Sequence, residues 1–284
     1  MQPLPQDLTL LTTAILGLAA VALVVVEPVA GRRHFRRFLA DVARDGESAR
    51  VHHLTRWSLM GWTWALATLA LVGVLPGVSA TDLGLRLPDL DGLLSFRGGD
   101  DGALAGLTTG LVIGLVAGLV VVTTAAVLPA RKGRRVPGPA NDAVQAMLPT
   151  STRGRWAWAG LSVTAGITEE ITYRGLLTLV VMTLAPTLPM TGLVAVLAVL
   201  FGVAHWYQGR SGMVVTGLAG AGLAVLYLAT GSLLVPMVLH VLMDLRALLL
   251  TPPAPEQEHD APVRRPDAGH ASLEPSRATT DPTS

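Results

Sequence analysis

Cysteine is absent from the sequence, and lysine occurs only at position 132. Without cysteine the chain has no disulfide, thiol nucleophile or thiolate metal ligand, so any metal site would need histidine and carboxylate side chains. Charged residues are scarce as well, at 14% of 284 residues, against about a quarter in an ordinary soluble domain. With 51% hydrophobic residues, the composition excludes an ordinary soluble domain and indicates a membrane protein. Nothing in the composition indicates nucleic acid binding.

Long apolar stretches predict the fold class. A transmembrane helix needs about 20 mostly apolar residues. Stretches that reach or approach this length predict an all-α bundle of about seven spans, at 8–28, 57–78, 103–128, 156–184, 188–207, 213–229 and 233–250. Arginines follow the first stretch instead of preceding it, which is the reverse of a signal peptide, so we expect a retained anchor.

The distribution of charge in the loops predicts the orientation. The loop 31–56 carries many arginines, whereas 79–102 carries several aspartates. Since basic loops stay on the cytoplasmic side, we expect an outside amino terminus and a cytoplasmic carboxyl tail. The bias to Ala, Leu, Val, Gly and Arg is typical of a GC-rich bacterial genome, which predicts a bacterial plasma membrane protein.

The chain divides into three predicted regions. Residues 1–155 form an amino-terminal transmembrane scaffold with basic cytoplasmic loops, 156–250 form a catalytic helical bundle, and 251–284 form a disordered cytoplasmic tail rich in Pro, Ser and Thr. In the scaffold, loop 31–56 is either an interfacial amphipathic helix or a solvated loop helix. Glycine at every fourth position of the third span, from 102 to 118, predicts close helix packing.

Ionisable residues inside the last four spans point to a site. A charged residue at the centre of a membrane helix costs about 2.5–3.5 kcal/mol on insertion scales. Such residues must therefore face the bundle interior, a water-filled cavity or each other. The candidates are Glu169, Glu170, Arg174, His205, His240 and Asp244.

Helix geometry suggests separate tasks for these residues. Glu170 and Arg174 are four positions apart, which places them on nearly one face and predicts an ion pair. Glu169 lies roughly 140° from Arg174 around the helix axis, so its carboxylate is free for a partner on another helix. A general base needs that freedom. His240 and Asp244, also four apart, place a carboxylate beside an imidazole.

Three short motifs occur in order along these spans. They are E-E-x-x-x-R-G at Glu169–Gly175, F-x-x-x-H at Phe201–His205, and H-x-x-x-N/D at His240–Asp244. In their order and spacing they resemble the CAAX prenyl protease and bacteriocin-processing (CPBP, or Abi) family of intramembrane glutamic endopeptidases. The resemblance covers roughly residues 156–250.

The resemblance implies that the chain hydrolyses a peptide bond in a membrane-associated or lipidated substrate, of which a prenylated CAAX-type peptide is one form. It implies that Glu169 activates water, oriented by Glu170 and Arg174. It implies that His205 positions the water and that His240 and Asp244 stabilise the oxyanion. An ionised Asp244 only accepts hydrogen bonds, unlike asparagine, so we expect it to orient His240 and leave the oxyanion to that histidine.

Two alternatives to this mechanism and function stay open. No cofactor is required by a glutamate mechanism, but Glu169, His205 and His240 also form a His₂Glu set that zinc would accept. The metalloprotease motif H-E-x-x-H is absent, so no independent signal supports the metal. The other classes of function are a non-catalytic immunity or scaffold protein and a small proton-coupled transporter, although no internal repeat supports transport.

Overall fold

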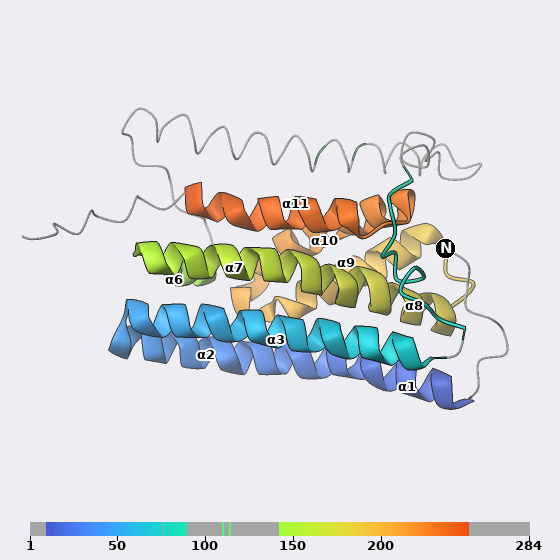
Figure 1. Cartoon of the computed structure of the whole chain (residues 1–284), viewed down its shortest axis with the longest axis horizontal. Coiled ribbons are helices and arrows are strands. Elements are labelled where there is room, and N and C mark those ends of the chain that lie inside the picture. Colours follow the sequence, from blue (N-terminus) through green and yellow to red (C-terminus); the bar gives the residue numbers. More distant parts are fainter. Residues whose placement is uncertain (1–9, 76, 90–109, 111–113, 115–141, 250–284) are drawn as a thin grey trace, which may run out of the picture. The chain divides into compact units, whose positions relative to one another are not determined.

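The computed structural model describes residues 10–75, 77–89, 110, 114 and 142–249 (Figure 1). Helices are the only regular elements in these residues, which confirms the all-α prediction; η marks π-helical and 3₁₀ segments. They are α1 (Leu10–Val21), η1 (Ala22–Val26), α2 (Glu27–Asp45), α3 (Glu47–Val74), α6 (Asp142–Met147), α7 (Thr152–Glu169), η2 (Glu170–Leu177), α8 (Thr178–Leu184), α9 (Met190–Ala204), η3 (Trp206–Gln208), α10 (Gly209–Thr230), α11 (Leu234–Leu245) and η4 (Arg246–Leu249).

Several helices have the length and composition of membrane spans. Those long and apolar enough to cross a membrane are Thr12–Asp45, Glu47–Val74 and Trp206–Thr230. Large apolar side chains on them, such as Leu18, Leu66 and Val215, are exposed, as expected for a surface that faces lipid. The chain is an integral membrane protein. The predicted third span, except Gly110 and Gly114, and the predicted tail lie outside the described residues.

Three of the predicted spans correspond to helices that carry the motifs. The stretch 156–184 is one continuous helix formed by α7, η2 and α8, 188–207 contains α9, and 233–250 contains α11 and η4. Figure 1 shows α7 between α3 and α11, which it contacts on either side. The motif-bearing helix therefore lies inside the bundle, where its polar groups avoid lipid.

The loop 31–56 differs from both expectations. The first helix continues through residue 45 and ends at Gly46, whose positive φ of 61° reverses the chain into α3. Phe35 and Phe38, which an interfacial helix would turn toward lipid, are instead buried against Leu54 and Trp158. Burial of these rings explains why the helix extends beyond the predicted span.

Small residues allow close helix contacts near the motifs. A Cβ on Gly166 of α7 would lie 2.8 Å from the backbone nitrogen of Val241, the residue after His240. A Cβ on Gly202 of α9 would lie 2.7 Å from the carbonyl oxygen of Met213 in α10. Since real Cβ atoms do not approach so closely, glycine sets both interhelical distances.

Glu47 joins the start of α3 to the start of α7. Its carboxylate accepts hydrogen bonds of 2.8–3.1 Å from the backbone N–H and hydroxyl groups of Thr150 and Ser151, and it pairs with Arg50. Ser151 is the N-cap of α7 and accepts a hydrogen bond of 2.9 Å from the N–H of Gly154. This carboxylate therefore helps to fix the position of the helix that carries Glu169.

We expect Glu47→Gln to lower the free energy of unfolding in detergent by about 1–3 kcal/mol at neutral pH, because charge-assisted hydrogen bonds are lost. Burial alone would raise the pKa of Glu47, but the hydrogen bonds from Thr150, Ser151 and Arg50 outweigh it and hold the pKa below its ordinary value of 4.5. The stabilisation is therefore fully present above pH 4.5 and is lost as the pH falls through the lower, folded-state pKa.

Unfolding curves of the parent and Glu47→Gln at pH 7 and at pH 3 measure this effect. The stability difference between the two proteins should shrink at the lower pH. A difference that stays constant would contradict the pH dependence. Asp45→Asn is the control, since Asp45 is half exposed and its ion pair is with the exposed Arg44.

Candidate active site

The helix that carries the first motif is not a regular α-helix. Residues Glu170–Leu177 form the π-helical segment η2, directly after Glu169 ends α7. The hydroxyls of Thr168, just before η2, and of Thr172, within it, donate to the carbonyl oxygens four residues earlier, at 2.9 and 2.8 Å. Such bonds bend helices, and π-helical turns are frequent at functional sites.

Glu170 and Arg174 form the predicted ion pair. Arg174 Nη1 lies 2.8 Å from Glu170 Oε1, and both side chains are buried. The second guanidinium nitrogen, Nη2, donates to the carbonyl oxygen of Gly220 at 3.2 Å, and the guanidinium lies 4.0 Å from the ring centroid of Phe201. The pair thus connects η2 with α9 and α10.

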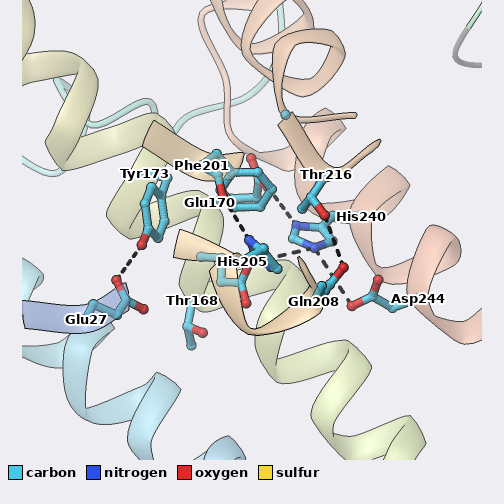
Figure 2. Close-up of polar contacts among 12 residues, drawn as sticks. Glu27, Thr168, Glu170, Tyr173, Phe201, His205, Gln208, Thr216, His240 and Asp244 are labelled. Atoms are coloured by element: carbon cyan, nitrogen blue, oxygen red, sulfur yellow. Dashed lines mark hydrogen bonds and ion pairs between the residues drawn. The ribbon is translucent and has the colours of Figure 1, made fainter. Parts of the chain in front are cut away.

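His240 is oriented by Glu170. His240 Nδ1 lies 2.8 Å from Glu170 Oε1, the same oxygen that pairs with Arg174 (Figure 2). Because a carboxylate paired with arginine is ionised and only accepts, Nδ1 is the donor. The opposite ring nitrogen, Nε2, therefore faces Glu169 Oε2 at 4.0 Å and Asp244 Oδ2 at 3.8 Å.

Asp244 lies beside His240 as its spacing predicts, but the hydrogen bond that orients the ring comes from Glu170. The distance of 3.8 Å from Asp244 Oδ2 to Nε2 is too long for a hydrogen bond, and the Asp244 side chain is 39% exposed. The carboxylate that holds the imidazole comes from another helix. Asp244 lies beside the free ring nitrogen, where it adds negative charge without fixing the ring.

His205 follows the last residue of α9 and faces Glu169 from the other side. Its Nδ1 lies 2.9 Å from the carbonyl oxygen of Phe201, so this nitrogen donates and Nε2 is left to face Glu169 Oε2 at 3.9 Å. The ring also packs against that of Phe201 at a tilt of 56°, with centroids 4.7 Å apart. Backbone and ring contacts together fix the direction of Nε2.

Glu169 lies between the two histidines. Its Oε2 atom is buried and has no hydrogen-bond partner among the residues that the structure describes, although the side chain as a whole is 28% exposed. The oxygen lies 3.9 Å from Nε2 of His205 and 4.0 Å from Nε2 of His240. These separations exceed a direct hydrogen bond but suit a bridging water.

The donors of the alternative zinc site are close to one another but do not form a ready metal site. Ligand distances to zinc are about 2.0–2.2 Å. Within the described residues, no group of three histidine, aspartate or glutamate side chains is arranged so that it could hold a metal ion.

Some contacts near the site were not predicted from the sequence. Tyr173, inside the first motif, donates its hydroxyl to the carboxylate of Glu27 at the start of α2 (Figure 2). Phe201, a motif residue without a predicted role, contacts Arg174 and His205. The signal for Glu27 was a lone carboxylate directly after the apolar run Ala22–Val26.

Fold and site define a polytopic helical membrane protein with a buried centre of one glutamate and two histidines. Residues 151–246 match the family described as Rce1-like, type II CAAX prenyl endopeptidase Rce1-like. This segment contains every predicted site residue, so the match confirms the resemblance to the CPBP family. The family is one of CAAX-type intramembrane proteases. Comparisons with curated proteins and with solved structures found no match.

Proposed function

We propose that the chain hydrolyses a peptide bond of a membrane-associated substrate with water activated by Glu169. The observation that carries the proposal is the position of Glu169 Oε2, which is buried and faces Nε2 of both histidines at 3.9 and 4.0 Å. Within the described part of the chain this oxygen has no hydrogen-bond partner. A water bound there would contact a base and a second polar group at once. This arrangement suits general-base catalysis.

The reaction balances with these residues alone. His205, with its proton on Nδ1, accepts a hydrogen bond from the water at Nε2. Glu169 takes the proton of the water as the oxygen attacks the carbonyl carbon. His240, doubly protonated, donates Nδ1–H to Glu170 and Nε2–H to the oxyanion. Glu169 then returns the proton to the leaving nitrogen and the C–N bond breaks. The remaining hydroxyl proton passes from the new carboxyl group to the amine, so a carboxylate and an ammonium group are released.

The family description names a CAAX prenyl endopeptidase. We therefore propose that the substrate is a membrane-associated peptide and that its prenylated form is recognised. The test uses the full chain in lipid vesicles with a farnesylated peptide that ends in a C-a-a-X sequence, and with the same peptide without lipid. Cleavage by the parent, but not by Glu169→Gln or His205→Ala, supports the protease. Cleavage of the farnesylated peptide alone supports prenyl recognition, whereas equal cleavage of both contradicts it.

Glutamate and metal mechanisms use the same side chains. A zinc ion held by Glu169, His205 and His240 would polarise a water at the same place. We expect cleavage to survive exhaustive chelation, because Glu169 is itself able to take the proton. Loss of cleavage on chelation, with recovery on addition of zinc, would overturn the metal-free mechanism.

We also propose that the α2–α3 turn faces the cytoplasm and that the segment after α3 faces outward, as the charge distribution predicts. The absence of cysteine makes introduced cysteines clean reporters. In intact cells, a membrane-impermeant maleimide should label Ala80→Cys and not Ser48→Cys, both at exposed positions. The reverse labelling would invert the orientation.

A further inference from the structure

Glu27 is a carboxylate in the first membrane helix, outside the segment that matches the protease family. It follows the apolar segment η1 and begins α2. A carboxylate at such a position needs a polar partner. The partner is Tyr173, a buried residue of η2, whose hydroxyl donates to Glu27 Oε2.

Ring contacts connect Tyr173 with both histidines. The Tyr173 ring meets the Phe201 ring edge to face, with centroids 5.2 Å apart. Phe201 in turn packs against the tilted ring of His205 at 4.7 Å and meets the His240 ring edge to face at 6.1 Å. A displacement of Tyr173 would therefore pass to Phe201, whose carbonyl oxygen accepts the Nδ1–H of His205.

The same helix also contacts the residues that follow His205. The guanidinium of Arg32 lies 4.3 Å from the ring centroid of Trp206, and the ring of Phe35 lies 5.2 Å from that of Tyr207. Helix α2 therefore supports His205 from two directions. It contacts Trp206 and Tyr207 directly, and through Glu27 and Tyr173 it contacts the ring of Phe201.

Both members of the Glu27–Tyr173 contact adjoin π-helical turns. Glu27 follows η1 (Ala22–Val26), and Tyr173 lies within η2 (Glu170–Leu177). A π-helical turn adds a residue to a helical turn and so redirects the side chains that follow it. Figure 2 shows the side chains of Glu27 and Tyr173, one after η1 and the other within η2, pointing toward one another.

We propose that Glu27 is a positioning residue for the active site: by binding the Tyr173 hydroxyl it holds the Phe201–His205 ring pair and directs His205 Nε2 toward Glu169. The proposal rests on the proposed function only for its effect on turnover. Its structural part, the placement of the His205 ring, is measurable without any substrate.

The test compares Glu27→Ala, Tyr173→Phe and the double variant in the full chain, with Glu27→Gln as the conservative variant. Histidine ring ¹⁵N signals are recorded by NMR, and those of His205 are identified by their loss in His205→Gln. We expect both single variants to shift the His205 signals in the same direction. We also expect kcat to fall about tenfold with KM within about twofold, since misplacement of a catalytic group acts mainly on turnover. The double variant should match the single ones, and Glu27→Gln, whose amide oxygen still accepts the hydroxyl, should recover most of kcat.

Val25→Ala is the matched control, because Val25 lies on the same helix and is exposed. It should leave the His205 signals and kcat as in the parent. His205 signals that stay unchanged in Glu27→Ala would overturn the proposal, as would additive losses of kcat in the double variant. If the parent cleaves no peptide, the proposed function fails, while the His205 signals still decide whether Glu27 positions that ring.

Discussion

Replacement of Glu169 by glutamine is expected to lower kcat/KM for peptide cleavage by about 10³-fold or more, in the upper part of the range for loss of a general base. Glutamine has nearly the same shape and preserves the packing, but its amide cannot take a proton from water. Because Glu169 Oε2 has no hydrogen-bond partner in residues 10–75, 77–89 and 142–249, the substitution breaks no hydrogen bond between that oxygen and these residues. The free energy of unfolding should therefore change little.

Cleavage kinetics in vesicles, together with an unfolding curve of each protein, measure this prediction. Asp244→Asn is the contrast, since Asp244 is 39% exposed and forms no hydrogen bond with His240. We expect this variant to retain or exceed the parental activity, because asparagine is able to donate to an oxyanion. Full activity of Glu169→Gln would contradict the assignment of Glu169 as the general base. Complete loss of activity in Asp244→Asn would show that the carboxylate of Asp244 is needed.

Arg174→Met is expected to destabilise the protein by about 3–5 kcal/mol, the usual cost when one partner of a buried ion pair is removed. The substitution leaves the buried carboxylate of Glu170 without its guanidinium and removes the contacts with Gly220 and Phe201. Since Glu170 also orients His240, activity should fall with stability. Chemical unfolding in detergent, followed by tryptophan fluorescence, measures the loss.

A double variant separates the loss of stability from the loss of activity. Glu170→Gln combined with Arg174→Met removes both buried charges, and replacement of a whole buried pair is often close to neutral. Stability should therefore recover in part, whereas activity should stay low because Glu170 no longer holds His240 as a carboxylate. A double variant less stable than Arg174→Met would contradict the assignment of the cost to an unpaired charge. Arg44→Ala, at an exposed ion pair, is the control and should cost at most about 1 kcal/mol.

Local spacing predicted a large part of the site. The Glu170–Arg174 pair follows from two residues four apart on one helix, and the motifs indicated the family that the match over 151–246 confirms. The separate direction of Glu169 also agrees with its position opposite the two histidines. These features depend on one helix or on a short motif, which the sequence specifies directly.

Contacts between distant segments were beyond the sequence pattern. The bond from His240 to Glu170 joins residues 70 positions apart, and nothing in the spacing of His240 and Asp244 favours it over the local partner. The sequence predicted a regular helix over 156–184 and did not indicate the π-helical segment η2. This segment contains Tyr173, which contacts Glu27. The extension of the first helix to Asp45 depends on burial of Phe35 and Phe38 among residues from other helices.

The origin of the oxygen in the new carboxyl terminus tests the central claim most directly. The purified full chain in vesicles, with the farnesylated peptide and in water enriched in ¹⁸O, is compared with Glu169→Gln and His205→Ala by mass spectrometry of the product. Hydrolysis by activated water predicts one ¹⁸O atom in the new carboxylate with the parent and no product above background with either variant. Labelled product formed equally by the parent and by Glu169→Gln would contradict the claim that Glu169 activates the water.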